Sequence, residues 1–375
     1  MSYLDKNYSV KMSLEGETQG EMNKILKLGL ALVLVFTLFG CSGNGGSSTD
    51  KKYADLKIAM VSDTVGTDQF ILQAKNKLEE LAKQYGFTAT FIECPNTDDW
   101  EQKSRNACEQ GYNLIVGVGV GWSGADALST LADEFSDIEF GIIDTAASNE
   151  RIMSIKYNTT DGCYVLGAMI ATAFKDDTTF GYIGNFQQQA NFEYKYGYME
   201  GVKSVNPNAT FIAAYADTYS DTSAAYNKAT EVAAAMDEKG HFIMGSVSNS
   251  ANAGIYQYCL ERANAGKSKI YTSGLSVDQT TSDNTYILTG LTKDTGIAME
   301  TIVNDYLDDN KVTGGVTTLG VTDGAFCVVG VNFDCNYRNT DILTDEVIAA
   351  GKKATEDLAN GKVTLPYVME ADYKN

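Results

Sequence analysis

The side chains best suited to chemistry in this sequence are polar and aromatic residues that come directly after short apolar runs. Carboxylates, an amide and a lysine at such places suit the hydroxyl groups of a ribose or another sugar, and aromatic rings offer flat surfaces on which a ring can stack. The candidate ligand-binding residues selected on this basis are Asp63, Phe70, Trp122, Asp144, Tyr194, Asn249, Ser276, Asp278 and Lys293.

Each of these side chains also has a plainer interpretation. A ring such as Phe70, Trp122 or Tyr194 could belong to the hydrophobic core and bind nothing. Asp144 and Asp278 could cap the N-termini of helices, because a carboxylate there accepts hydrogen bonds from the first backbone N–H groups. The sequence leaves both alternatives open.

The elements that would position these residues are clearest in residues 180–215. FGYIG is a short apolar run typical of a buried strand, and a polar loop without periodicity follows it. Apolar residues then recur with helical spacing until Asn206-Pro207, which ends the helix. A second strand follows at 209–215. This unit places its loop at the carboxyl end of a strand, where open α/β sheets bind small ligands.

The same alternation of strands and helices runs along most of the chain. The earlier strands are predicted at 56–61, 87–92, 113–120 and 140–144, and the helices between and after them at 97–110, 124–135 and 162–174. This alternation predicts an α/β fold with parallel, doubly wound sheets, and its restart at residue 180 indicates two lobes.

The restart of the strand–helix pattern sets the boundaries that we predict for the two lobes. We place lobe 1 at 55–158 and lobe 2 at 159–276, each completed by part of 277–375, and we expect hinge crossings near 158–162 and 276–280. In a two-lobed α/β protein, residues at the carboxyl ends of strands converge on the cleft between the lobes. The candidate residues are therefore expected to share one site.

Nothing in the sequence favours catalysis. His241 is the only histidine, and nothing around it suggests an oriented nucleophile. P-loop, dinucleotide-binding and HExxH motifs are absent, and paired carboxylates such as Asp98-Asp99 have the context of a solvated surface. We predict a binding protein with no catalytic residues and no cofactor, not an enzyme.

Composition argues against two further classes. The formal net charge is −20, with 49 acidic and 29 basic residues, and such an acidic surface repels phosphate backbones. We therefore expect no nucleic-acid binding. Seven cysteines are present without a CxxC pair, so no metal site is predicted. Several have the context of small buried hydrophobes, while a bridge between Cys327 and Cys335 stays open.

The N-terminal part, residues 1–54, has the pattern of a targeting segment and a tether. After Met22, which we take as the true start, come two lysines and a short apolar run that ends at Gly40-Cys41. This is typical of a secretory signal peptide, and its end resembles a bacterial lipobox in which Cys41 is lipidated. A weak transmembrane anchor is the alternative. Residues 42–54 are rich in Gly and Ser, which predicts a flexible tether.

Several motifs together resemble the basic membrane protein family of lipoproteins, which includes the purine-nucleoside receptors of bacterial ABC transporters. The motifs are FGIID at 140–144, GYMEGVKSVNP at 197–207, LTGLTK ending at Lys293, and GGVTTLGVTDGA at 314–325. The resemblance covers nearly all of the chain after the tether. It implies a fold similar to type I periplasmic binding proteins: two lobes joined by a hinge of three crossings, with the ligand between them.

The resemblance also implies roles for individual residues. In members that bind purine nucleosides, the base stacks between aromatic rings, and carboxylates and a lysine hold the ribose. Carried over by motif, Asp63 and Asp144 are the carboxylates, Phe70 is a stacking ring and Lys293 is the lysine. Trp122 stands where the family usually has a phenylalanine.

Two departures from the family pattern bear on the ligand. The first loop, SDTVGTDQFIL, is shorter and lacks the family's Asn-Gln, and Ser276 replaces the first carboxylate of D-x-D-Q. A hydroxyl in place of a carboxylate gives up a charge-assisted hydrogen bond. The identity of the ligand is therefore less constrained than the fold.

The expected function is capture of a small ligand, by resemblance a purine nucleoside, and its delivery to an ABC transporter permease. The protein would be lipid-anchored on the extracytoplasmic face of the cell membrane. One alternative is the same fold binding a sugar or another ring compound, and another is a sensory or surface-interaction lipoprotein. An enzyme of nucleoside cleavage is disfavoured, because no acid–base constellation is present.

Overall fold

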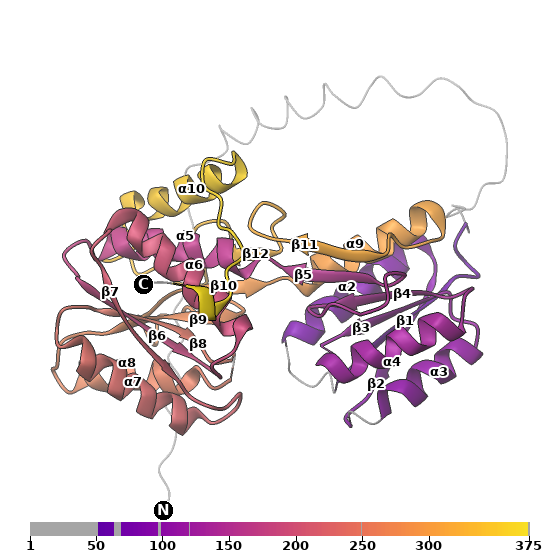
Figure 1. The fold of residues 1–375 in the computed structure, drawn as a ribbon, viewed down its shortest axis with the longest axis horizontal. Helices are drawn as coiled ribbons and strands as arrows, with labels where there is room; N and C mark the ends of the chain where they lie inside the picture. The colour runs from indigo at the N-terminus through magenta and orange to yellow at the C-terminus, as the bar shows by residue number, and fades with distance from the viewer. Residues whose placement is uncertain (1–51, 64–68, 97–98, 120, 249, 374–375) are drawn as a thin grey trace, which may run out of the picture. The chain divides into compact units, whose positions relative to one another are not determined.

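The computed structural model of the protein describes residues 52–63, 69–96, 99–119, 121–248 and 250–373, apart from the side chains of 121–123 and 372. The expected signal peptide, the lipidated Cys41 and most of the tether lie outside these residues. The chain from Lys51 onward forms one compact unit. Within this unit the strands belong to two separate sheets, and each sheet is the centre of one lobe (Figure 1).

Lobe 1 is built on a parallel sheet. Its strands are β1 (Lys57–Ser62), β2 (Thr88–Glu93), β3 (Leu114–Val118), β4 (Glu139–Ile143), β5 (Met153–Tyr157) and β11 (Gly315–Leu319). Their spatial order is β11-β5-β4-β3-β1-β2. Its helices are α2 (Gln69–Tyr85), α3 (Trp100–Glu109), α4 (Gly121–Glu134) and α9 (Thr295–Asp309). α9 comes from late in the chain and packs against α2 and β4.

Alternating side chains on the strands bury both faces of this sheet. In β1, Ile58 and Met60 join the hydrophobic cluster that contains α2 and α9, whereas Ala59 and Val61 join the cluster that contains α3 and α4. Because successive side chains of a strand point to opposite faces, a strand with an unbroken apolar run is covered on both sides. Lobe 1 is therefore a three-layer α/β/α structure.

Lobe 2 repeats the arrangement. Its strands are β6 (Thr179–Gly184), β7 (Thr210–Tyr215), β8 (Phe242–Ser246), β9 (Tyr271–Ser276), β10 (Ile287–Lys293) and β12 (Phe326–Val328). Their order is β12-β10-β9-β8-β6-β7, parallel except for the antiparallel pair β10–β12. Its helices are α5 (Thr159–Ala173), α6 (Gln189–Val205), α7 (Thr222–Met236), α8 (Ala253–Asn264) and α10 (Asp345–Ala359), with the short 3₁₀ helix η2 (Glu370–Asp372) near the end.

The predicted fold class is confirmed. Both sheets have the same strand order, with the second strand of each lobe at one edge and the first beside it, as in doubly wound folds. Among the described residues the chain passes between the lobes at Asn158, at Asp294 and at 320–325. The crossing expected near 276–280 lies at Asp294 instead, because β9 and β10 pair in the same sheet.

β5, with the sequence MSIKY, was not predicted as a strand. It lies in the segment that the sequence pattern treats as a bridge before α5, and it is short and carries the exposed Lys156. Its pairing partner on one side is β11, which lies far along the chain. A strand whose neighbour comes from a distant segment has no local signal for its pairing.

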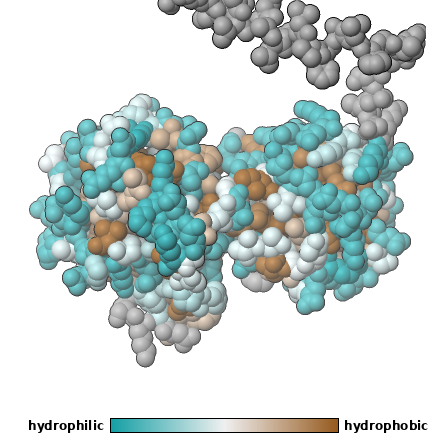
Figure 2. Space-filling model, turned by 90° about the horizontal axis from the view of Figure 1, so that it is seen from above, coloured by the Kyte–Doolittle hydropathy of each residue, from teal (hydrophilic) through white to brown (hydrophobic). Residues whose placement is uncertain are grey.

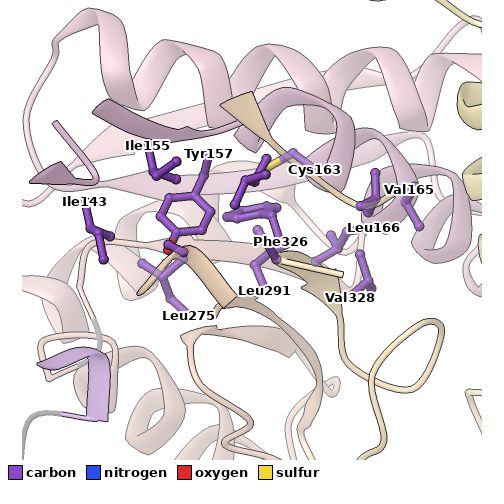
Figure 3. Packing of buried hydrophobic residues seen from close by; sticks show 14 of the residues in the cluster. Ile143, Ile155, Tyr157, Cys163, Val165, Leu166, Leu275, Leu291, Phe326 and Val328 are labelled. Carbon is purple, nitrogen blue, oxygen red and sulfur yellow. The ribbon is translucent and has the colours of Figure 1, made fainter. Parts of the chain in front are cut away.

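One hydrophobic cluster continues from lobe 1 into lobe 2. Figure 3 shows the part of it around the crossings, where Ile155 and Tyr157 of β5 lie near Leu275 of β9 and Phe326 of β12. The crossings are also hydrogen-bonded to one another: the Tyr157 hydroxyl donates to the main-chain oxygen of Asp294 at 3.1 Å. The base of the cleft is therefore a packed junction.

Helix α6 is held close to α5 by glycines. A Cβ on Gly197 would lie 2.2 Å from the main-chain oxygen of Thr160, and one on Gly201 would lie 2.1 Å from that of Tyr164. Such contacts are shorter than any carbon and oxygen tolerate, so only glycine permits this approach of the two helices. The approach fixes the position of α6, which carries the candidate residue Tyr194.

The surface of the described residues is mostly hydrophilic on the face shown (Figure 2). On the face shown in Figure 2, hydrophilic residues cover most of each lobe, and hydrophobic residues are visible only in small groups. Within the described residues, none of the helices combines the length and apolar character needed to cross a membrane.

Candidate functional site

A cavity of about 660 Å³ lies where the carboxyl ends of strands from both lobes meet. Its lining includes Phe70 and Asp144 from lobe 1 and, from lobe 2, Asn185, Gln188, Ala190, Asn191, Tyr194, Tyr219, Ser246, Ser248, Ser250, Leu275, Ser276 and Lys293. The volume is within the range typical of small-molecule sites, and most of the lining is polar or aromatic. This cavity is the candidate binding site.

A charged pair joins the two lobes inside the cavity. Lys293, the last residue of β10, donates from Nζ to both carboxylate oxygens of Asp144, at 2.9 and 3.0 Å. Asp144 follows β4 and has φ 69°, a left-handed conformation that is uncommon outside glycine. It lies at the end of a strand, not at the start of a helix, so the N-cap alternative is wrong for this residue.

Lys293 keeps its charge in spite of burial. Burial by itself would lower the pKa of Lys293, but the Asp144 carboxylate and the Tyr194 hydroxyl more than offset this, and the pKa lies above its ordinary value. The lysine is therefore an ammonium ion at neutral pH. It can donate to a ligand oxygen while Asp144 accepts from a ligand hydroxyl.

Three aromatic rings line the same cavity, and two of them, Phe70 and Tyr194, were predicted from the sequence. Phe70 lies in the first turn of α2, and Tyr194 lies on α6 with its ring edge-on to Phe326 at a centroid distance of 6.1 Å. Both rings are partly buried and pack against the central hydrophobic cluster. Each ring thus has one side in the core and another part facing the cavity, so core packing and ligand contact are compatible here.

The Tyr194 hydroxyl should make the stability of the protein depend on pH under alkaline conditions. Burial raises the pKa of Tyr194 from its ordinary value of 10.0 to about 12. Between these values the unfolded chain loses a proton that the folded chain keeps, so the free energy of unfolding falls as pH rises from 10.0 to about 12. Denaturant titrations across this pH range should show that the free energy of unfolding falls less steeply with pH for Tyr194→Phe than for the unsubstituted chain.

Other buried tyrosines and cysteines titrate in the same range, but they contribute equally to both proteins. The difference between the two slopes therefore reports the Tyr194 hydroxyl together with its effect on the pKa of Lys293. Equal slopes would contradict a buried, neutral Tyr194 hydroxyl.

The lobe 2 wall presents fixed amides. The Asn191 amide donates to the main-chain oxygen of Phe186 at 2.9 Å and also to the Asn185 side chain. Asn185 in turn donates to the main-chain oxygen of Val247 at 2.9 Å. Because these hydrogen bonds tie the loop after β6 to the first turn of α6 and to the loop after β8, the polar groups of this wall are held in place before any ligand arrives.

Tyr219 is a functional candidate that the sequence reasoning missed. It follows β7, is 54% exposed, and its ring lies 4.9 Å from that of Phe186. Gln188 donates from Nε2 to its hydroxyl at 3.2 Å. The signal was present, because Tyr219 comes just after a predicted strand, as does Asn185. The rule that selected Asp63 and Tyr194 would have selected both.

The structure brings five of the nine predicted site residues together in the cavity lining: Phe70, Asp144, Tyr194, Ser276 and Lys293. Like Asp144, Ser276 has a left-handed backbone, with φ 71°, and it ends β9. Strained conformations of non-glycine residues cluster at functional sites. Two of them in one lining therefore add to the case for this cavity.

The other four predicted residues divide into two groups. Asp63 is exposed at the end of β1 and does not contribute to the lining that the described residues form. Asp278 accepts from the N–H and hydroxyl of Thr280 at 2.8 and 2.7 Å and from the N–H of Asn336, so it braces a loop and does not cap a helix. Asn249 and the side chain of Trp122 lie outside the described residues.

The remaining reactive groups lie apart from the cavity lining. His241 pairs through Nδ1 with Asp177 at 2.7 Å. Cys327 and Cys335 are free thiols, so the bridge left open by the sequence is not formed. In the described part of the chain, no three His, Cys, Asp or Glu side chains lie close enough together to hold a metal ion.

Comparison with known proteins is informative for nearly the whole chain. Residues 57–367 match the model of a family described as ABC transporter substrate-binding protein PnrA-like. The "ABC transporter nucleoside-binding protein BmpA" of Lactococcus lactis is 27% identical over 360 residues, which are 90% of this chain and 97% of that protein. The "Basic membrane protein A" of Borreliella afzelii is 24% identical over 337 residues, or 88% and 96% of the two chains.

Solved structures agree on the fold. A solute-binding protein of an ABC transporter system from Aeropyrum pernix superposes with a TM-score of 0.66 at 15% identity, covering 84% of this chain and 95% of that one. AraP, an arabinose-binding protein from Geobacillus stearothermophilus, superposes with a TM-score of 0.59 at 14% identity, covering 73% and 96%. At these identities the likeness concerns the fold alone.

Proposed function

The chain belongs to the family of PnrA-like ABC transporter substrate-binding proteins, as its motifs predict, and on this premise we propose that it captures a nucleoside for an ABC permease. The observation that carries the proposal is the content of the cavity: two aromatic rings, Phe70 and Tyr194, beside the Lys293–Asp144 pair. A nucleoside has both parts that this set would bind, a flat base and a ribose with hydroxyls.

Each part of the ligand has a chemical counterpart in the lining. A base would stack on the Phe70 and Tyr194 rings. The ribose hydroxyls would donate to the Asp144 carboxylate and accept from the Lys293 ammonium. Since the charges of Asp144 and Lys293 cancel, the lining suits a neutral ligand such as a nucleoside better than a phosphorylated nucleotide.

Capture would follow from the division of the site between two lobes. Phe70 and Asp144 come from lobe 1, and the amides, the hydroxyls and Lys293 come from lobe 2. A ligand that contacts both walls at once stabilises the state in which they are close, so it shifts the hinge equilibrium toward closure. Binding and release suffice for this role, and we propose that the protein is not an enzyme.

The proposed location follows from the N-terminal sequence. The lipobox-like ending at Cys41 and the Gly- and Ser-rich tether after it favour a lipid-anchored protein on the extracytoplasmic face of the membrane. There it would hand its ligand to the permease of the transporter.

The proposal is tested by thermal unfolding of the unit from Lys51 onward in the presence of single ligands. Adenosine, guanosine, inosine, the free bases, ribose, arabinose and galactose form the panel. A ligand at 100 times its dissociation constant adds about 2.7 kcal/mol to the free energy of unfolding, which raises the melting temperature by several degrees. If only sugars raise it, the nucleoside assignment is wrong and the sugar-binding alternative holds.

Phe70→Ala identifies the cavity as the place of binding. Loss of a stacking ring costs about 1–3 kcal/mol per base, so nucleoside affinity by calorimetry should fall about fivefold or more. Phe91→Ala is the control, because Phe91 is also partly buried against the same hydrophobic cluster but does not line the cavity. Equal affinity losses for both variants would place the ligand elsewhere.

A further inference from the structure

Thr295 connects the cavity to the hinge. It is the first residue of α9, is 0% exposed, and follows the crossing residue Asp294 directly. Its hydroxyl donates to the main-chain oxygen of Phe70, and its N–H donates to Oε1 of Gln73 at 3.3 Å. One buried residue at the hinge thus holds the first turn of α2, which carries the Phe70 ring.

Asp294, which directly precedes Thr295, is held in place by two hydrogen bonds of its backbone. The N–H of Asp294 donates to the main-chain oxygen of Ala325 at 2.8 Å, and its main-chain oxygen accepts from the Tyr157 hydroxyl at 3.1 Å. Residues of all three crossings therefore meet at Asp294. Lys293, the cavity lysine, is the residue directly before it.

The contacts form a short path between two cavity groups of different lobes. The Phe70 backbone is joined to Thr295 by one hydrogen bond, and Thr295 is joined to Lys293 through Asp294 by two peptide links. The backbones that carry the ring and the ammonium are therefore linked by covalent geometry and one hydrogen bond. Helix termini fray, so a hydrogen bond to the first turn of α2 steadies the backbone that carries the Phe70 ring.

We propose that Thr295 is a positioning residue for ligand binding. Its hydroxyl holds Phe70 at the place where the ring and the Lys293–Asp144 pair can contact the same ligand. The inference rests on the proposed function. Thr295 does not contribute to the described lining of the cavity, so its effect on affinity passes through Phe70. Preorganisation of this kind lowers the ordering cost of binding.

Three variants separate positioning from general stability. Thr295→Val keeps the shape and removes the hydroxyl, Thr295→Ser keeps the hydroxyl, and Thr289→Val is the matched control. Thr289 is also 0% exposed and donates its hydroxyl to a main-chain oxygen, that of Val329 at 2.7 Å, but it does not line the cavity. Calorimetry with the nucleoside that stabilises the parent protein most should show about fivefold weaker binding for Thr295→Val, from the loss of one neutral hydrogen bond.

Thr295→Ser and Thr289→Val should bind the nucleoside like the parent, even if their melting temperatures fall. A double-mutant cycle gives the second criterion: in a Phe70→Ala background, Thr295→Val should cause no further loss of affinity, because its effect acts through that ring. Equal affinity of Thr295→Val and the parent, or full additivity with Phe70→Ala, would overturn the inference.

A measurement made without ligand tests the role of Thr295 separately from the proposed function. Amide hydrogen exchange in the first turn of α2 should be faster in Thr295→Val than in Thr295→Ser or Thr289→Val. If no nucleoside binds the parent protein, the nucleoside assignment fails while this exchange result still decides whether Thr295 holds Phe70. Unchanged exchange in Thr295→Val would show that it does not.

Discussion

Replacement of Lys293 by methionine is expected to weaken nucleoside binding by at least about tenfold, the largest effect of any single change in the cavity. A hydrogen bond between a ligand and a charged group is worth about 1.5–3 kcal/mol, and the substitution removes it. The change removes the ammonium that would donate to the ribose, and it also leaves the Asp144 carboxylate without the two hydrogen bonds at 2.9 and 3.0 Å. Isothermal titration calorimetry on the parent and the variant measures the loss.

Lys195→Met is the matched control for this experiment. The Lys195 side chain has the same 16% exposure as that of Lys293, and its Nζ lies at the same 2.9 Å from a carboxylate oxygen, here of Glu370. It does not line the described cavity. Both variants should lose some stability, because each removes a largely buried ion pair, but only Lys293→Met should lose affinity. Comparable affinity losses would mean that the cavity lysine has no special role.

Gly197→Ala is expected to give the largest loss of stability. A Cβ at this position would lie 2.2 Å from the main-chain oxygen of Thr160 and 2.9 Å from Cβ of Cys163. Backbone atoms cannot turn aside as side chains do, so α5 and α6 must separate, and overpacking of this kind costs about 1–3 kcal/mol or more. The melting temperature should fall by about 2 °C or more in spite of the better helix propensity of alanine.

Ser204→Ala tests whether the effect belongs to the contact and not to the helix. Ser204 is an exposed residue near the end of the same helix, where substitutions usually change stability by less than about 0.5 kcal/mol. Differential scanning calorimetry on both variants is sufficient. An unchanged midpoint for Gly197→Ala would show that α5 and α6 are not packed as closely as described.

Most of the fold could be predicted from the sequence, because its elements are marked by local patterns. Buried strands such as β1 and β6 are continuous apolar runs, and α6 ends where Asn206-Pro207 forbids further helix. β5 could not be predicted, since its short sequence MSIKY becomes a strand by pairing with β4 and with the distant β11. The second crossing was misplaced for the same reason: only the pairing of β9 with β10 shows that both belong to lobe 2.

The candidate site could be predicted in part. Strand ends mark where a ligand binds in such a fold, which led to Asp144, Tyr194 and Lys293. The same rule could not tell which side chain at a strand end points into the cavity. Asp278 has the right place in the sequence, yet its carboxylate accepts hydrogen bonds from Thr280 and Asn336 and braces a loop.

By itself, the sequence of this protein determined the class of fold, the repetition of one α/β plan in two lobes, and the residue types offered at the strand ends. These follow from short-range patterns of apolar, polar and helix-ending residues. Only the tertiary structure decided which of these residues meet: Lys293 reaches Asp144 across the lobes, and Thr295 holds Phe70, although the partners lie far apart along the chain. Such contacts depend on the pairing of distant strands and helices, and local sequence carries no record of that pairing.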